Sequence, residues 1–477
     1  MDSQLSVGLE FEMKSAFTAA ELIEANPELD RLEIIKDHVP VIGRRAARGQ
    51  YSHKEYKSWG LHDPSEPAYP EGSQLQEIKR PDTICSFRQY HDEPLRLIQQ
   101  ILDKDGIKAT VHADLTSKQM DYSVVPWSVQ RDASLQGLTD EQKITAYPQT
   151  TKTIEEAKET DCYGVELVTW PLTSASLARE SISQAAKALL THSQHGFIVD
   201  DEAGLHAHVG QIDGEPLELR VLQNFAFLIV IFEDELSLLH SHKRRRGSDN
   251  TEIESNRVEF SAEGAPEVAR LVPDVTDATK MISSMFYQNY MSIAEIKEKM
   301  YGEVDRARNP RDRFRQLTGG KQHAVNFSYC SRTEGGATVE FRQHDGTMDG
   351  ETVEHWYRHC HALVTLAQRH AREQTTIMEA LNITDWDSKN IDMEKLWDEM
   401  ALPDNSRGFY RARIAAYKAL DPCWAPFPPV FEAVGDLEGD EFVEEEEKDY
   451  DSEADSAYFT SSEAGFGDIG STRSINT

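Results

Sequence analysis

The sequence predicts an α+β fold built around an antiparallel sheet with one open face. Four separate stretches alternate apolar and polar residues with a period of two, which is typical of half-buried strands. Polar residues on the outward side of each strand favour antiparallel pairing with one face open to solvent. Three further stretches repeat apolar residues at helical spacing and predict helices: Ser176–His195, Leu217–His240 and Glu351–Ala371.

The first predicted strand runs from Leu5 to Met13 and carries two acids on its polar face. Glu10 and Glu12 lie about 6 to 7 Å apart at the usual rise per strand residue. Two carboxylates this close repel each other unless they are protonated or hold a cation. The pair is therefore a candidate site for a hard metal such as Mg²⁺, and a solvated polar face is the alternative.

Three later strands present ionisable groups in the same manner: Tyr163–Leu172 with Glu166, Gly204–Gly210 with His206 and His208, and Thr338–Arg342 with Glu340 and Arg342. If the four strands are neighbours, their polar groups converge on one cleft. Four carboxylates and an imidazole could then ligate two or three divalent cations, and a guanidinium could hold a planar oxyanion. Such a set suits phosphoryl transfer from ATP, and a metal-free sheet with coincidental polar faces is the alternative.

The rest of the chain predicts further helices, one more strand and two insertions. Helices are expected at Ala16–Ile35, interrupted by Pro27, at Glu93–Lys104 and at Thr276–Tyr301, and a strand at Ile107–Ala113. The insertions lie near residues 36–75 and 126–160, and the second is either a mobile flap or a surface insertion. We expect one catalytic domain over residues 1–430 and an acidic, disordered tail over 435–477.

The charge balance argues against nucleic acid and anionic membranes as partners. The 477 residues carry a formal net charge of −33, and residues 432–477, with fifteen acidic residues against two basic ones, account for −13 and leave −20 on the rest. The longest strongly apolar run, Phe225–Phe232, is far shorter than the roughly 20 residues of a membrane-spanning helix. The chain starts directly with a strand rather than a signal peptide, and its five scattered cysteines predict reduced thiols, so we expect a cytoplasmic protein.

Four motifs, in this order, resemble the amidoligase family of carboxylate-amine ligases, which is related to glutamine synthetase and glutamate-cysteine ligase, and in particular its fungal-type members. The motifs span roughly residues 5–370 and are Gly8-Leu9-Glu10-Phe11-Glu12, Gly164-Val165-Glu166-Leu167-Val168-Thr169-Trp170-Pro171-Leu172, His206-Ala207-His208-Val209-Gly210, and Val339-Glu340-Phe341-Arg342 followed by Asp345-Gly346-Thr347. The resemblance implies a glutamine synthetase-like catalytic domain, in which a curved antiparallel sheet arches over the site with helices on its back. It also implies that ATP converts a carboxylate to an acyl phosphate, which an amine then attacks to give an amide.

The resemblance also implies roles for individual residues. Glu12 and Glu166 would ligate a Mg²⁺ next to the acceptor carboxylate, and the metal that bridges the ATP phosphates would be held by Glu10, His206 and Glu340. Arg342 would steady the transferred γ-phosphoryl group. The expected catalytic residues are thus Arg342, Glu340 and His206, and the expected ATP-binding residues are Arg342, His208 and Lys321. The implied substrates are a small-molecule or peptide carboxylate and an amine.

Several alternatives stay open. The same carboxylate and histidine cluster could serve a metal-dependent hydrolase, and the chain could also be a non-catalytic binding protein descended from a ligase. The elements with which glutamine synthetase binds ammonium are not found here, which argues against ammonia as the amine. Lys321 could instead lie at a polar strand start, and Arg342 could pair with Asp345. The basic stretch His242–Gly247 is either a solvated loop or a loop that closes over phosphates or an acidic substrate.

Overall fold

The computed structural model describes most of the chain between residues 4 and 420. The described residues are 4–25, 94–111, 127–244, 253–257, 292–318, 323–330, 337–375, 379, 383 and 393–420, apart from single or paired positions at 133, 136, 194, 195, 201 and 254. All of them belong to one compact unit, formed by Met1–Gly49 together with Arg88–Phe431. The predicted insertion at 36–75, the acidic tail and Lys321 lie outside the described residues.

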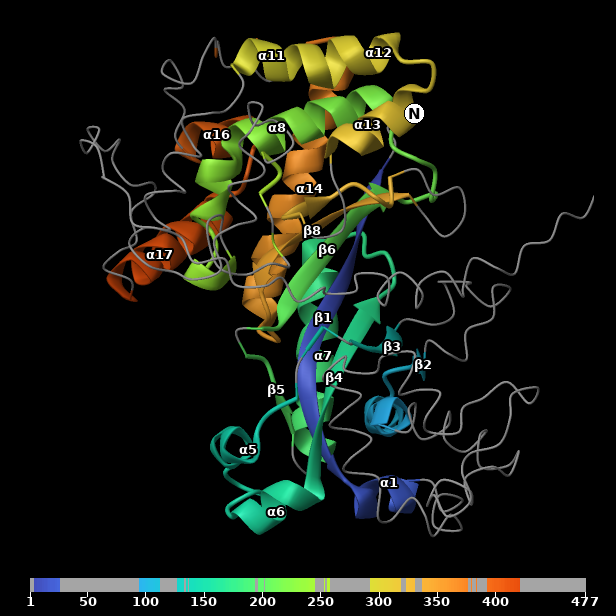
Figure 1. The fold of residues 1–477 in the computed structure, drawn as a ribbon, viewed down its shortest axis with the longest axis vertical. Helices are drawn as coiled ribbons and strands as arrows, with labels where there is room; N and C mark the ends of the chain where they lie inside the picture. The colour runs from blue at the N-terminus through green and yellow to red at the C-terminus, as the bar shows by residue number, and fades with distance from the viewer. Residues whose placement is uncertain are drawn as a thin grey trace, which may run out of the picture. The chain divides into compact units, whose positions relative to one another are not determined.

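A curved, open sheet forms the centre of this unit, with the strand order β2-β3-β4-β1-β6-β8-β7 and β5 paired to β1 (Figure 1). The strands are β1 (Leu5–Thr18), β2 (Ala109–Val111), β3 (Trp127–Arg131), β4 (Thr160–Thr169), β5 (Phe197–Ile198), β6 (Gly204–Gln211), β7 (Val325–Asn326) and β8 (Thr338–Asp345). The four strands expected to carry the site are adjacent in the sheet and pair antiparallel as β4-β1-β6-β8.

The apolar face of the central strand supplies the core. Val7 and Leu9 are 0 % exposed and Phe11 is 1 % exposed, so each contributes about 1.5 to 3 kcal/mol of burial free energy. On β8, the ring of Phe341 packs edge-on against Trp356 and Phe225. Because side chains alternate along a strand, this burial turns the acids of β1 and β8 toward the opposite face.

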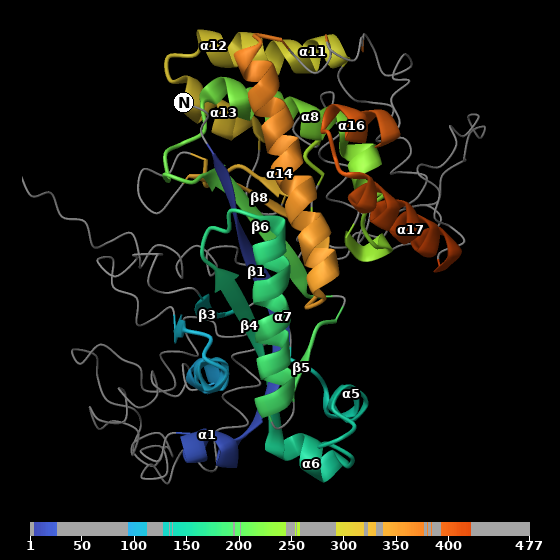
Figure 2. The same cartoon turned by 180° about the vertical axis from the view of Figure 1, so that it is seen from behind.

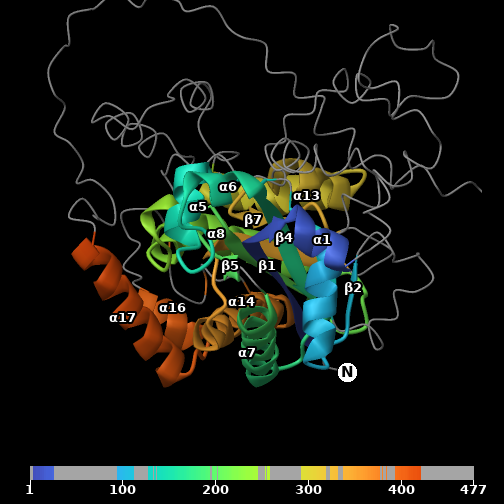
Figure 3. The ribbon, with the colours of Figure 1, turned by 90° about the horizontal axis from the view of Figure 1, so that it is seen from below.

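Three long helices supply the other half of the core: α7 (Ala175–His192), α8 (Leu219–Ser237) and α14 (Gly350–Arg372). Figures 2 and 3 show α7 and α14 side by side on one face of the sheet, where α14 packs against α7, β1 and β6. The side chains of Ser174 and Asp349 cap the N-termini of α7 and α14. The prediction of these three helices is confirmed to within a few residues at each end.

The sheet is mixed, which corrects the prediction of a wholly antiparallel sheet. β2 and β3 pair in parallel, and β3 then pairs antiparallel with β4. The predicted insertion at 126–160 is therefore partly wrong as well, because Trp127 and Val129 of β3 are buried in the sheet. The rest of this segment contains α5 (Asp140–Ala146) and α6 (Ile154–Glu159). Buried Lys143 of α5 joins the two helices, because its ammonium donates to the carbonyls of Ala157 and Thr160.

The first predicted helix begins later than expected, because β1 continues to Thr18 before α1 (Ala19–Ala25) starts. Thr18 ends the strand and forms a reciprocal cap with Glu21. A helix at 94–104 matches its prediction. The other elements are η4 (His242–Arg244), α11 (Ile293–Lys297), η6 (Glu298–Glu303), α12 (Val304–Arg306), α13 (Pro310–Thr318), α16 (Met393–Glu399) and α17 (Asp404–Leu420). Among the described helices, none is long and apolar enough to cross a membrane.

Candidate functional site

The strand register brings the predicted polar groups together on the sheet face opposite α7 and α14. Glu12 of β1 lies directly across from Glu166 of β4, and Glu10 lies across from His206 of β6. On the other side of β6, His208 lies across from Glu340 of β8. Side chains at paired positions point to the same face, so four separated stretches of sequence converge.

Two groups of three side chains have ligand atoms within 4.8 Å of one another, which is the spacing that a shared metal ion requires: Glu10, His208 and Glu340, and Glu10, Glu166 and His206. In the first group, His208 Nε2 lies 2.9 Å from Glu10 Oε1 and 3.9 Å from Glu340 Oε1. In the second group, His206 Nδ1 lies 3.3 Å from Glu10 Oε2. Glu10 belongs to both groups and is thus the centre of the cluster.

Glu12 lies at the enclosed end of the cluster and belongs to neither group within the described residues. One of its oxygens accepts the N–H of Gly204 at 2.6 Å, and the other lies 3.3 Å from His206 Nε2. The ligand atoms of Glu166 therefore lie within 4.8 Å of those of Glu10, which suits a shared metal, whereas the expected metal site of Glu12 with Glu166 does not meet this spacing. Burial raises the pKa of Glu12, partly offset by the charge of His206.

Glu340 and Arg342 form the other edge of the site. Glu340 is 2 % exposed and accepts one hydrogen bond from Asn326 Nδ2 and one from Arg342 Nη1, each at 2.7 Å. The alternative pairing of Arg342 with Asp345 is wrong, because Asp345 accepts from Ser241, Arg413 and Tyr417 instead. The Nε of Arg342 has no hydrogen-bond partner among the described residues.

Burial and neighbouring charges shift the pKa values of the cluster in opposite directions. Burial and the neighbouring charge of Glu10 raise the pKa of Glu166 well above its usual value. Burial also works to raise the pKa of Glu10, but the charge of His208 and hydrogen bonds from both histidines hold that pKa well below its usual range. The carboxylates of Glu10 and Glu340 outweigh burial at His208 and raise its pKa to about 9. A divalent cation would displace these protons, because metal ligands bind in their deprotonated forms.

The donor types fit a divalent cation. Three carboxylates offer the oxygen ligands that suit Mg²⁺ and Mn²⁺, and two imidazoles add nitrogen ligands, which transition metals accept more readily than Mg²⁺. Further polar side chains form hydrogen bonds to these ligands and hold them in place. Besides Asn326, these include Thr338 Oγ1, which lies 3.2 Å from His208 Nδ1.

Gln130 was not predicted as a site residue, and Arg244 was not distinguished within the basic stretch His242–Gly247, which was expected to be either solvated or closed over phosphates or an acidic substrate. Gln130 of β3 donates to Glu166 Oε2 at 2.7 Å, and Arg244 of η4 lies with Nη2 4.0 Å from Glu12 Oε2. The short alternation Trp127-Ser128-Val129-Gln130 is the signal that could have found Gln130. No local pattern distinguishes Arg244 from its basic neighbours.

The predicted metal-ligating acids, both histidines and Arg342 are thus brought together, whereas Lys321 lies outside the described residues. The family model described as "Putative amidoligase enzyme" matches residues 4–364, a span that includes the whole cluster. The architecture is mixed α/β, and the family match suggests a ligase. The chain belongs to the amidoligase family. No curated protein and no solved structure matches it.

Proposed function

We propose that the protein is an ATP-dependent carboxylate-amine ligase that forms an amide through an acyl-phosphate intermediate. Membership of the amidoligase family supports the reaction class. The observation that carries the proposal is the convergence of Glu10, Glu166, His206 and Glu340 with Arg342 on one sheet face. We infer that the curved sheet with α7 and α14 behind it is the glutamine synthetase-like catalytic domain of this family.

Divalent cations, Mg²⁺ in the first instance, would neutralise the ATP phosphates and the acceptor carboxylate. Glu10, His208 and Glu340 would hold the cation at the phosphate side. Glu166 and His206, together with the shared Glu10, would hold the cation at the acceptor side, with Glu12 beside them. A carboxylate oxygen is a poor leaving group and phosphate is a good one, so phosphorylation prepares the acid for attack by the amine.

Arg342 is the residue that we assign to the γ-phosphoryl group. Its bond to Glu340 fixes the guanidinium at the edge of the cluster, and its buried Nε has no hydrogen-bond partner among the described residues. The Arg342 side chain as a whole is 20 % exposed, so part of it can meet a ligand. Planar N–H donors match phosphate oxygens and strengthen as negative charge develops in the transfer.

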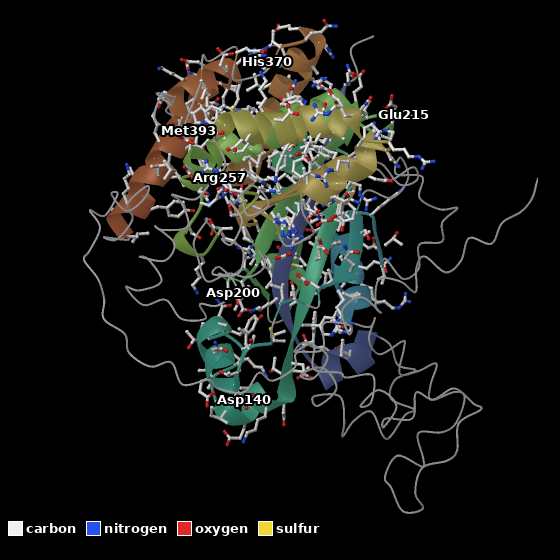
Figure 4. All side chains as sticks on the ribbon, turned by 45° about the horizontal axis from the view of Figure 1, so that its top comes forward. Asp140, Asp200, Glu215, Arg257, His370 and Met393 are labelled. Carbon is white, nitrogen blue, oxygen red and sulfur yellow. The ribbon has the colours of Figure 1, made fainter. Side chains whose placement is uncertain are left out.

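The loop before β6 encloses the other end of the site. Lys14, which follows Glu12 on the same face of β1, is 2 % exposed and pairs with Asp200 and Glu202 at 2.5 Å each; Asp200 is labelled in Figure 4. These ion pairs hold the loop across the polar face next to Glu12. Exclusion of water at this end would protect an acyl phosphate from hydrolysis.

We also propose a cytoplasmic location and small-molecule or peptide substrates. Cys162, Cys330 and Cys360 are free, buried thiols, which is typical of proteins in a reducing compartment. The net charge of −33 disfavours nucleic acid as a partner.

The proposal is tested by incubating the purified protein with ATP, Mg²⁺ or Mn²⁺, and pooled amino acids and amines. Mass spectrometry should detect ADP and new amides in equal amounts, and the Glu340→Gln variant should form neither. In a parallel incubation with a pool of amides and metal, cleavage to acid and amine without nucleotide would identify a metal-dependent hydrolase instead. The absence of any ATP-dependent product would reject the ligase.

A further inference from the structure

One guanidinium of the basic stretch His242–Gly247 is buried beside the carboxylate cluster. Arg244 is 3 % exposed, whereas its neighbour Lys243 is exposed. A basic loop in an acidic protein is ordinarily solvated, because burial of a cation costs free energy unless anionic groups compensate it. The burial of Arg244 therefore needs a partner.

The described residues offer Arg244 a carbonyl and a distant carboxylate, but not a full set of hydrogen-bond acceptors. Arg244 Nη2 donates to the carbonyl of Glu202 and lies 4.0 Å from Glu12 Oε2, which is too far for a hydrogen bond. The Nε of Arg244 is buried and has no hydrogen-bond partner among the described residues. Glu12 Oε2 already accepts the N–H of Gly204. Among the described residues, the guanidinium thus has the charges of Glu12, Asp345 and Asp132 nearby but keeps one unused donor, Nε, at the enclosed end of the site.

The backbone is shaped to admit this guanidinium. A Cβ at Gly204 would stand 2.9 Å from His206 Nε2, 3.0 Å from Arg244 Nη1 and 3.1 Å from Glu12 Oε2. The three polar groups therefore meet over a position that has no room for a side chain. The turn η4 positions Arg244, because its backbone N–H donates to the carbonyl of Ser241. Ser241 in turn donates its N–H and its hydroxyl to the carboxylate of Asp345.

The two arginines near Glu12 occupy different parts of the site. Arg342 is bonded to Glu340 on β8, at the accessible edge, and Arg244 lies against β6 beside Glu12. If Arg342 meets the phosphates, then Arg244 is the other guanidinium among the described residues that lies beside the carboxylate cluster and can face the second anionic reactant. A guanidinium binds a substrate carboxylate by charge-assisted hydrogen bonds.

We propose that Arg244 is the residue that binds the carboxylate of the acid substrate. This assignment deepens the proposed function and rests on it for the reaction, although binding can be measured without turnover. Arg244 selects acids that present a free carboxylate at the Glu12 end of the cleft.

Calorimetric titration of L-glutamate, succinate and acetate, with Mg²⁺ and a non-hydrolysable ATP analogue present, tests the proposal. The unaltered protein should bind at least one of the three acids. Arg244→Gln should weaken that binding about tenfold or more, and Arg244→Lys should weaken it less, because a lysine keeps the charge but loses the planar fork. Lys243→Gln, the matched control, should bind within about twofold of the unaltered protein, since Lys243 is exposed.

Titration of the ATP analogue alone separates the two arginines. Arg342→Gln should weaken nucleotide binding, whereas Arg244→Gln should not. Melting temperatures of all variants check the fold, and Arg244→Lys serves as the comparison if Arg244→Gln does not fold. Unchanged carboxylate binding in both Arg244 variants, or no binding of any of the three acids by the unaltered protein, would overturn the assignment. Arg244-dependent carboxylate binding without ADP formation would retain it and reject the ligase alone.

Discussion

Glu10 and Glu12 share a strand face but have different surroundings. Glu10 is partly exposed and contributes a ligand atom to both three-residue groups, and Glu12 is buried against the Gly204 amide. Strand alternation predicted that these acids face the same way. Their different environments come from the register of β6 against β1, which brings the Gly204 amide to Glu12 and which the sequence did not predict.

Replacing Glu10 or Glu12 with Gln should abolish nucleotide turnover while leaving the fold intact. An amide keeps the shape, relieves carboxylate repulsion and loses affinity for the cation. A loss of about 100-fold or more corresponds to roughly 3 kcal/mol of transition-state stabilisation. ADP formation and melting temperature are measured together, with Glu180→Gln on the exposed side of α7 as the control. Unaltered turnover in both site variants would reject the metal assignment.

Arg342→Lys should slow the chemistry more than it weakens ATP binding. The substitution keeps the charge but removes the planar guanidinium. In the unaltered protein this group donates to Glu340 through Nη1, and its Nε has no partner among the described residues. The interaction strengthens as charge develops, so we expect a loss of about 1 to 3 kcal/mol, roughly tenfold to a hundredfold in rate. Single-turnover ADP formation measures it. Normal turnover in a less stable variant would show that Arg342 has only a structural role.

At the scale of elements, α7 and α14 cross with no space to spare at the start of α14. A Cβ at Gly350 would stand 2.3 Å from Ser183 Oγ and 2.9 Å from the carbonyl of Arg179. Gly408 in α17 has no atom within 4 Å of the same position. The two glycines are thus both helical but differ in the space around them, so the same substitution can be compared at both.

Gly350→Ala should destabilise the protein by about 1 to 3 kcal/mol, because the helices must move apart. Gly408→Ala should be neutral or stabilise by about 0.5 to 1 kcal/mol through the helix propensity of alanine. Chemical unfolding of both variants measures the difference. Equal free energies of unfolding would show that the α7–α14 contact adjusts without cost.

Helix α17 packs against α14, where Tyr410 contacts His359, and Arg413 and Tyr417 bind Asp345 at the end of β8. A buried histidine cluster lies at this contact, formed by His240, His344 and His359, all 1 % exposed. Burial lowers the pKa of His344 and of His359 to about 3 each, and lowers that of His240 well below its usual value. Arg413 of α17 adds to the effect at His240 and His344, Arg244 adds to it at His344, and Asp345 opposes it at both.

These histidines should make the protein less stable in acid. Their pKa values are lower in the folded state than in the unfolded one, so the stability is complete above about pH 6.5 and falls as the pH drops below that value. At pH 5 each buried histidine costs up to about 2 kcal/mol. The free energy of unfolding is measured from pH 8 to pH 5, and His359→Phe should reduce the slope. A slope unchanged by that substitution would contradict the role of the cluster.

At the scale of the whole molecule, the sequence predicted what local alternation determines. It predicted the polar faces of β1, β4, β6 and β8 and the long apolar helices behind them. It did not predict the parallel β2–β3 pair, because strand direction depends on contacts between distant segments. Arg244 was not distinguished from its basic neighbours for the same reason, since its burial depends on Gly204 and on the Ser241–Asp345 contact.

The contacts of Asn256 and Arg257 with α8 and β7 illustrate how segments that are distant in the sequence complete the site. Arg257, labelled in Figure 4, donates to the carbonyls of Val230 and Ile231. The adjacent Asn256 bonds both backbone groups of Val325 in β7, which places Asn326 against Glu340. Such a chain of contacts leaves no periodic pattern in the sequence.

The central claim is that the site phosphorylates a carboxylate. It is tested most directly by following oxygen from amino acids labelled with ¹⁸O in their carboxylates, incubated with ATP, Mg²⁺ and pooled amines. The account predicts that each amide formed is accompanied by one phosphate that carries a single ¹⁸O atom, and that Glu340→Gln releases none. Phosphate that acquires oxygen only from water, with no label from the acid, would contradict carboxylate activation.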